Sequence, residues 1–275
     1  MPTPPRHFGL IIQTKYYATN MPLSKSDQIT ILEKLRSAKN IVILSGAGLS
    51  AESGIPTFRD SSNSLWANVE PMEVASLQGF LSNPDKVWAW HEDMRKLFAN
   101  TSPNGGHEAI VQLEALLQPA KVKIITQNID GFHQEAGSSW VAEIHGSTTR
   151  IRCHRRCGFV AAWDDNAPRK CPVCAAATRP DVVWFGEGLD EMLFELAEET
   201  AASADVFFTV GTSGIVQPAA SLATLAKNCG AIVIEVNPGE SNHAVIADYA
   251  VSASATEFFQ SLCKAIKTMK LRQLR

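Results

Sequence analysis

Four cysteines fall close together in residues 153–174, with the spacing C-x3-C-x13-C-x2-C: Cys153, Cys157, Cys171 and Cys174. Two pairs of thiolates at such short spacings are typical of a tetrahedral zinc site. Because four protein ligands leave no open coordination position, we expect a structural ion that stabilises a loop-rich segment. Two alternatives stay open, namely four unrelated thiols and His154 as a ligand.

A glycine-rich turn follows the first apolar run of the chain. Residues 40–45 (NIVILS) predict a buried strand, and residues 46–50 (GAGLS) begin a helix directly after it. Glycines there allow backbone N–H groups to approach a pyrophosphate closely. Ala51 stands where the dinucleotide fingerprint has its third glycine, so a turn without a ligand is the alternative. The Phe58-Arg59 pair beyond the helix favours a ligand.

Polar side chains follow a second predicted strand, residues 121–125 (KVKII). Gln127, Asn128 and Asp130 stand just beyond its end, where parallel sheets place their ligands; a solvated loop is the alternative. Further on, His145 ends a short apolar stretch. An imidazole with an ordinary pKa near 6.5 accepts a proton at neutral pH. His145 is therefore a candidate general base, with a purely structural role as the alternative.

Three further segments stand beside predicted strands. The segment 179–187 (RPDVVWFGE) predicts an extended chain that could pair with a bound peptide by strand addition, and a core strand is the alternative. Small-residue turns at 211–220 and 236–240 follow strands predicted to end at residues 210 and 236. A nucleotide bound at this edge of a sheet would continue across both turns.

The elements that must position these residues alternate along the chain. Strands are predicted at 40–45, 121–125, 205–210, 231–236 and 248–252, and helices at 27–38, 106–118, 190–203, 216–228 and 256–269. This alternation predicts an α/β fold with a Rossmann-like doubly wound parallel sheet. Residues 60–105 and 147–188 do not fit it. We expect them to form a smaller lobe from a helical insertion and a zinc-ribbon insertion.

Composition excludes several classes of protein. The chain has 275 residues, 45% of them hydrophobic, and a net charge of −3. No apolar run is long enough for a membrane span, and no basic field supports nucleic-acid binding. A zinc-ribbon nucleic-acid binder is therefore disfavoured. The cysteine usage indicates a reducing compartment, and we expect a cytoplasmic protein. Residues 1–25 are expected to be a flexible extension, with an organelle-targeting segment as the alternative.

Taken in order, these motifs resemble the sirtuin family of NAD-dependent protein deacylases. The resemblance spans Asp27 to Leu262 and rests on GAGLSAESGIPTFR (46–59), TQNID (126–130), His145-Gly146, the four cysteines, VVWFGE (182–187) and GTS (211–213). It implies NAD as co-substrate, one structural zinc ion and acyl-lysine proteins as substrates. We expect a monomer rather than an oligomer. It also implies an NAD-binding domain from residues 26–59, 106–146 and 189–275.

The resemblance assigns roles to individual positions. His145, Asn128 and Asp130 match catalytic residues. NAD contacts are implied for Gly46, Ala47, Gly48, Ser50, Thr57, Phe58, Arg59, Trp66, Gln127, Asn128, Ile129, Asp130, Gly211, Thr212, Ser213, Asn237, Pro238, Gly239 and Ala255. Substrate contacts are expected for His91, Met94, Val182, Trp184, Phe185, Gly186 and Val216.

One departure from the family concerns the acyl group. VVWFGE resembles the branch that includes desuccinylases, which carry Tyr-x-x-Arg in the helical insertion to bind an acyl carboxylate. This chain has His91 and Met94 at those positions, and Arg95 is one residue away on a different helix face. Gln217 also stands where that branch has Tyr. We therefore expect acetyl, lactyl or other neutral acyl groups to be preferred to succinyl.

The resemblance implies a chemical sequence for the reaction. The acyl oxygen attacks C1′ of the nicotinamide ribose and nicotinamide leaves. His145 takes a proton from a ribose hydroxyl, which attacks the resulting imidate carbon, and water then releases deacylated lysine and O-acyl-ADP-ribose. Two alternatives use the same NAD pocket: protein ADP-ribosyl transfer, and a non-catalytic module that senses NAD or ADP-ribose. The presence of His145 with Asn128 and Asp130 favours deacylation.

Overall fold

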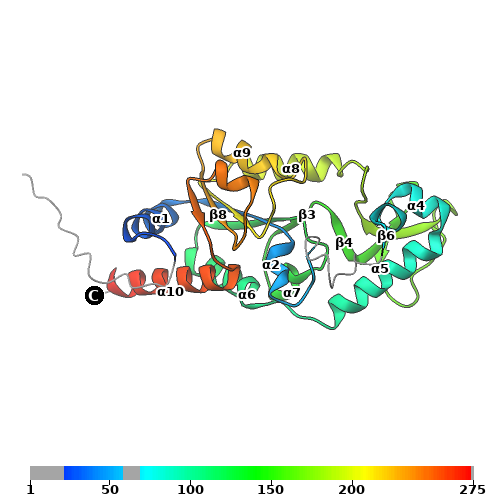
Figure 1. The fold of residues 1–275 in the computed structure, drawn as a ribbon, viewed down its shortest axis with the longest axis horizontal. Coiled ribbons are helices and arrows are strands. Elements are labelled where there is room, and N and C mark those ends of the chain that lie inside the picture. The colour runs from blue at the N-terminus through cyan, green and yellow to red at the C-terminus, as the bar shows by residue number, and fades with distance from the viewer. Residues whose placement is uncertain (1–21, 58–68, 274–275) are drawn as a thin grey trace, which may run out of the picture.

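The computed structural model of the chain describes residues 22–57 and 69–273 (Figure 1). Within these ranges the strands form two separate sheets. The larger is parallel throughout, with the order β3-β2-β1-β7-β8-β9. Its strands are β1 (Asn40–Ser45), β2 (Lys121–Thr126), β3 (Val141–Glu143), β7 (Val206–Val210), β8 (Ile232–Val236) and β9 (Tyr249–Val251).

The strand order runs outward in both directions from the pair β1 and β7, which lie side by side. This confirms the predicted Rossmann-like doubly wound sheet, and it places the topological switch point between the carboxyl ends of these two strands. The five predicted strands agree with the observed ones to within one residue at each end. The short strand β3 was not predicted, because three residues within an apolar stretch carry little periodicity.

Helices cover both faces of the large sheet. Ile41 and Ile43 of β1 pack in one core, with residues of α1 (Lys25–Ser37), α6 (Gly105–Leu117) and α10 (Ala255–Gln273). Val42 and Leu44 point to the other face and pack with α8 (Glu191–Ala202) and α9 (Ser221–Asn228). Figure 1 shows α8 and α9 on the side of the sheet opposite α6 and α10. Burial on both faces explains why β1 is apolar without alternation.

Two helix limits differ from the prediction by more than two residues. The helix expected from residue 216 begins at Ser221, and residues 217–220 form turns instead. Pro218 restricts the residue before it to extended backbone and lacks an amide donor, which accounts for the later start. Helix α10 runs to Gln273, beyond the expected residue 269.

A second, antiparallel sheet with the order β5-β4-β6 lies beside the large one. It contains β4 (Gly146–Cys153), β5 (Val160–Ala162) and β6 (Thr178–Val182). Helices α3 (Pro71–Val74), α4 (Leu77–Ser82) and α5 (Pro84–Ala99) share a core with it, which includes Trp88, Trp163 and Trp184. These elements form the smaller lobe at the right of Figure 1. The lobe predicted from residues 60–105 and 147–188 is thus built from both segments, within their described parts.

Three short helices complete the described chain: α2 (Ala47–Ala51), α7 (Phe132–Ala136) and the 3-10 helix η1 (Asn242–Val245). Among the helices described, none combines the length and apolar character that a bilayer crossing requires.

Candidate functional site

The glycine turn lies at the switch point, where the carboxyl ends of β1 and β7 meet. Gly46 donates its N–H to Val210 O (2.9 Å) and Gly48 donates to Gly211 O (2.8 Å). A Cβ on Gly48 would lie 2.8 Å from Gly211 O, and one on Gly211, whose φ is +57°, would lie 2.3 Å from Leu49 N. The two loops therefore require glycine for backbone contact. Ala51 is exposed, so no close approach demands a third glycine there.

A hydrogen-bonded network joins this turn to the end of β2. The Asn128 side-chain amide donates to Gly46 O and to Ser50 Oγ, both at 3.1 Å. Ser50 Oγ donates to Asp130 (2.7 Å), which also accepts from Phe132 N–H. Burial raises the pKa of Asp130, while these two donors act in the opposite direction. The predicted residues Ser50, Asn128 and Asp130 thus form one rigid polar group at the sheet edge.

A second network extends across the ends of β2, β7 and β8. Gln127 Nε2 donates to Thr212 Oγ1 (3.0 Å), and Asn237 Nδ2 donates to Thr212 O (3.0 Å). Ser213 O accepts from Asn242 N–H (3.0 Å). The loops predicted to continue a nucleotide site are therefore in mutual contact, with Pro238, Gly239, Ile129 and Ala255 in the same loops or directly after them. Small residues and several donors give this edge the character of a nucleotide site.

His145 follows β3 and faces the end of β2. Its Nδ1 lies 3.0 Å from Gln127 O, which assigns the ring proton to Nδ1 and leaves a lone pair on Nε2. Nε2 has no hydrogen-bond partner among the described residues. Burial lowers the pKa of His145, and the Gln127 carbonyl offsets part of this effect. The ring is therefore neutral at pH 7 and able to accept a proton.

Segment 179–187 has features of both interpretations, an extended chain that pairs with a peptide and a core strand. Val182 ends β6, and Val183 donates its N–H to His145 O (2.9 Å). Trp184 is buried in the lobe core, as a core strand would be. Phe185 is half-exposed and bonds through its N–H to Ala75 O (2.9 Å). Gly186, with φ +80°, ends the extended stretch. Val216, in the segment that follows β7, is half-exposed.

His91 and Met94 lie inside the small lobe. Both side chains are buried and belong to, or contact, the core that contains Trp184. His91 Nδ1 bonds to Val87 O (2.9 Å), and Nε2 accepts from Trp184 Nε1–H (3.2 Å). Burial lowers the pKa of His91 to about 4, so this ring is neutral. The sequence did not indicate the contact between His91 and Trp184, because no periodic pattern connects residues so far apart.

A buried ion pair holds the end of the same segment. Arg179 donates to both carboxylate oxygens of Glu187 (2.6 and 2.9 Å), and Glu187 also accepts from Trp184 N–H (3.0 Å). The Arg179 side chain is 2% exposed and that of Glu187 is 12% exposed. Burial acts to raise the pKa of Glu187, but the hydrogen bonds and charge of Arg179 outweigh it and lower that pKa.

Replacement of Glu187 by glutamine is expected to lower the free energy of unfolding by about 3–5 kcal/mol, because Arg179 would stay buried without its counter-charge. The control Glu73→Gln, in an exposed pair with Lys86, should change it by about 1 kcal/mol or less. Urea unfolding at pH 7 measures both.

The contribution of Glu187 has a defined pH dependence. Its lowered pKa means that the stabilisation is complete above the ordinary glutamate pKa and is lost as the pH falls through the folded value. Equal losses of stability for the two variants at pH 7 would contradict the assignment of a strong buried pair.

The four cysteines form a compact cluster at the far end of the small sheet. Their Sγ atoms all lie within 4.8 Å of one another, and two pairs, Cys153–Cys174 and Cys157–Cys171, are 3.4 Å apart. Zn–S bonds of about 2.3 Å in a tetrahedron give S···S separations of about 3.8 Å, so the cluster fits one structural Zn²⁺. His154 is not part of the group; its ring packs against Phe80 (5.4 Å), which rules against it as a ligand.

Three of the predicted NAD contacts, Phe58, Arg59 and Trp66, lie outside the described residues. Thr57 is the last described residue before them. Asn104 was not singled out by sequence, yet its side chain caps α6 and donates to Leu49 O (2.8 Å). An asparagine before a helix is a capping signal, but nothing in the sequence indicates its contact with α2.

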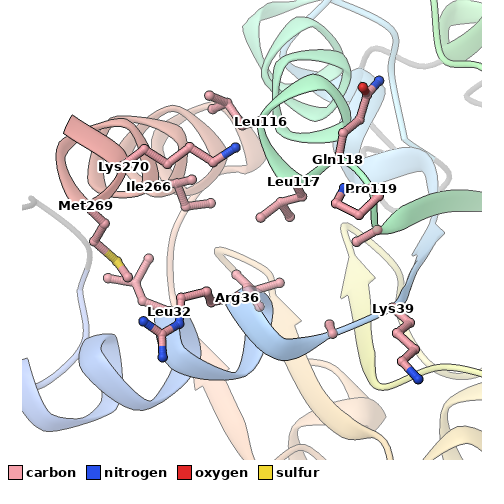
Figure 2. A pocket seen from close by; sticks show the side chains of 13 residues that line it. Leu32, Arg36, Lys39, Leu116, Leu117, Gln118, Pro119, Ile266, Met269 and Lys270 are labelled. Carbon is pink, nitrogen blue, oxygen red and sulfur yellow. The ribbon is translucent and has the colours of Figure 1, made fainter. Parts of the chain in front are cut away.

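A cavity of about 320 Å³ lies elsewhere, between α1, α10 and the end of α6. Figure 2 shows Leu32, Leu117 and Ile266 around it, with Arg36 and Lys270 also on its lining. It is found beside Lys39 and Ala120, just before β1 and β2 begin. His145 and the glycine turn lie at the carboxyl ends of these strands, whereas the cavity lies at their amino ends. The cavity is therefore separate from the candidate site.

Comparison with known proteins agrees with this geometry. The Sir2 family model matches residues 46–218. The chain is 44% identical over 239 residues to an NAD-dependent protein deacylase of Mycobacterium tuberculosis, covering 83% of this chain and 98% of the relative. It is 41% identical over 243 residues to NAD-dependent protein deacylase 2 of Pyrobaculum aerophilum, covering 87% and 96%.

Solved structures give the same result. A Sir2 homologue in complex with NAD superposes with a TM-score of 0.78 at 39% identity, covering 88% of this chain and 94% of that one. A Sir2 variant with a deacetylated p53 peptide and 3′-O-acetyl ADP-ribose gives 0.75 at 28% identity, covering 86% and 97%. From its sequence motifs, its fold and these similarities, the chain belongs to the Sir2 family.

Proposed function

We propose that this chain is an NAD-dependent protein-lysine deacylase that prefers acetyl or other neutral acyl groups to succinyl groups. The main observation is the neutral His145 ring with Nε2 unpartnered among the described residues, beside the networks at the switch point. The relatives named as NAD-dependent protein deacylases support the activity. The complex of a Sir2 variant with a deacetylated peptide supports a protein substrate.

NAD, as co-substrate, supplies the ribose carbon that receives the acyl oxygen when nicotinamide leaves. Asn128 and Asp130, fixed by Ser50, orient the nicotinamide end, and the loops at Gly46 and Gly211 hold the phosphates. His145 takes a proton at Nε2 from a ribose hydroxyl and is kept in the correct tautomer by the Gln127 carbonyl. Each of these groups acts by holding or moving a proton or by positioning the substrates.

Segment 182–186 binds the peptide substrate next to this base. Val183 is already bonded to His145 O, so the segment and the base share one backbone frame. The half-exposed Phe185 side chain offers an apolar contact for a peptide that lies along this segment. Apolar side chains such as Phe185 and Val216 exclude water from the reacting centre.

The preference for neutral acyl groups rests on the charges near α5. His91 and Met94 are buried, and His91 is neutral with both ring nitrogens bonded. Arg95 is directed to Glu92 (2.7 Å) and Asp165 (3.5 Å) on the outer side of the helix. No cation at these positions is therefore free to pair with a succinyl carboxylate, whose burial without a partner is costly.

The experiment is a comparison of acetyl-, lactyl- and succinyl-lysine versions of one peptide, with the unacylated peptide as control. Nicotinamide release and O-acyl-ADP-ribose are followed by mass spectrometry. We expect kcat/KM for the succinyl peptide to be at least about tenfold below that for the acetyl peptide, since an unpaired carboxylate costs more than 1.4 kcal/mol.

Two results would contradict the proposal. Succinyl turnover equal to or faster than acetyl turnover would overturn the acyl preference. Absence of acyl-dependent nicotinamide release, with NAD binding intact, would overturn the deacylase assignment and favour ADP-ribosyl transfer or NAD sensing.

A further inference from the structure

Arg150 connects the two sheets at the point where the general base and the substrate segment meet. It lies in β4, and its Nη1 donates to Glu143 Oε2 (2.7 Å), while Nε donates to Asp181 Oδ2 (3.0 Å). Glu143 ends β3 of the large sheet, two residues before His145. Asp181 lies in β6, directly before Val182. One guanidinium thus holds the strand that leads to the base and the strand that leads to the substrate segment.

The backbone makes this connection at one end only, where Val183 donates its N–H to His145 O (2.9 Å). Strands β4 and β6 pair at Gly146–Val182 and Ser147–Asp181, but the register is interrupted before Ile151 pairs with Pro180. Pro180, which has no N–H to donate, lies on β6 at the edge of this sheet. Arg150 lies within this interruption and adds side-chain bonds to the strands on either side of it.

The two carboxylates that bind Arg150 are more buried than Arg150 itself, whose side chain is 36% exposed. The Glu143 side chain is 8% exposed and that of Asp181 is 17% exposed, so both carboxylates are largely removed from water. Hydrogen bonds between a guanidinium and carboxylates are short and directional, so they fix the positions of the groups that they join. Asp181 also lies 3.8 Å from Arg152, whose Nη2 is 3.5 Å from Glu187. The ionic contacts therefore extend along the substrate segment from its start to its end.

We propose that Arg150 is a positioning residue that fixes His145 relative to segment 182–186, so that the base and the acyl-lysine meet in reacting geometry. This inference rests on the proposed deacylase function. Displacement of reacting groups by about 1 Å can lower a rate about 100-fold. Loss of the clamp should therefore affect the peptide-dependent steps, while leaving NAD binding, which depends on the loops after β1, β2 and β7, unchanged.

The test compares Arg150→Met, Arg150→Lys and wild type. Methionine keeps much of the length but no charge, and lysine keeps the charge but not two donors in a fork. We expect Arg150→Met to lower kcat/KM for the acetyl peptide by about tenfold or more, with lower kcat and higher peptide KM. The Kd for NAD should stay unchanged. Arg150→Lys should recover part of the loss. Arg36→Met, an exposed change on α1, is the control.

A double variant separates positioning from simple destabilisation. Arg150→Met leaves Glu143 buried without a partner, so it also lowers stability. Glu143→Gln in the same chain removes that unpaired charge and should restore much of the melting temperature. If Arg150 acts by positioning, the double variant regains stability but not kcat/KM. If kcat/KM returns with stability, or if folded Arg150→Met is as active as wild type, the inference is wrong.

Failure of the Arg150 inference can be distinguished from failure of the proposed deacylase function. Wild-type protein without acyl-dependent nicotinamide release would contradict the proposed function. An active wild type with unaffected Arg150 variants would contradict only the role of Arg150.

Discussion

Replacement of His145 by alanine is expected to lower the rate of deacylation by about 10²- to 10⁴-fold, the usual contribution of a positioned general base. NAD affinity should change little, because the glycine turn and the Ser50–Asn128–Asp130 network contain no contact from the imidazole. Nicotinamide release with an acetyl peptide measures the rate, and calorimetric titration measures the Kd for NAD.

A matched control accounts for the loss of a buried ring. His243 is buried, and its Nε2 bonds to the backbone carbonyl of Ala220 (3.2 Å), much as His145 bonds to Gln127. The variant His243→Ala should lose comparable stability but keep most of its kcat. Turnover by His145→Ala within tenfold of wild type would show that another group accepts the proton.

The pH dependence of kcat/KM tests the same assignment. Burial lowers the pKa of His145, so the ring stays unprotonated, and competent as a base, to pH values below its ordinary 6.5. Activity should therefore be constant around neutrality and fall only as the pH drops through the lowered pKa. An acid limb with its midpoint at or above 6.5 would contradict the buried, neutral state of this histidine.

The sequence was sufficient to predict the sheet and the edge at which the site lies. Residues 41–44 are an uninterrupted apolar run, and residues 121–125 combine two lysines with Val122, Ile124 and Ile125; both segments are followed by small or polar residues. Such segments are typical of buried parallel strands when helices separate them. Because parallel strands present their carboxyl ends together, the sequence places Gly46 and Asn128 at the same edge of the sheet. Their hydrogen bond depends in addition on the pairing of β1 with β2, which the sequence did not predict.

Contacts inside the small lobe could not be predicted in the same way. His91 and Trp184 meet through a single hydrogen bond between segments far apart in the sequence, and Arg150 bridges two different sheets. Such contacts depend on how the lobe folds over the sheet, and they leave no period of 2 or 3.6 in the chain. The antiparallel strands here are short, and β5 has only three residues. Their register is visible only in three dimensions.

Loss of the zinc ion is the other change expected to have a very large effect. The cysteines contribute no atom to the hydrogen bonds around His145, yet they connect the strands that lead to it. Cys153 ends β4, whose first residue follows His145, and Thr178 begins β6, which leads to Val182. Any change that releases the cysteine end of this sheet therefore also releases the strands next to the base.

Comparison of free energies indicates that the small sheet does not stay folded without the zinc ion. Structural zinc binds zinc-finger peptides with an apparent free energy of about 10–16 kcal/mol, whereas whole domains are stable by only about 5–15 kcal/mol. The small sheet has a short strand β5, a break between β4 and β6, and a lobe core shared with α3 to α5. Its own packing is therefore too small to replace the metal.

Replacement of Cys171 by serine is accordingly expected to reduce bound zinc from one ion per chain to almost none and to abolish deacylation. Residues 147–188 should become the first site of cleavage in limited proteolysis, while the large sheet stays folded, since none of its strands contributes a ligand. The control Cys229→Ser changes an exposed thiol outside the cluster and should keep both zinc and activity. Full activity of Cys171→Ser with zinc absent would mean that the lobe folds on packing alone, because a structural ion contributes to the rate only by holding β4 and β6 in place.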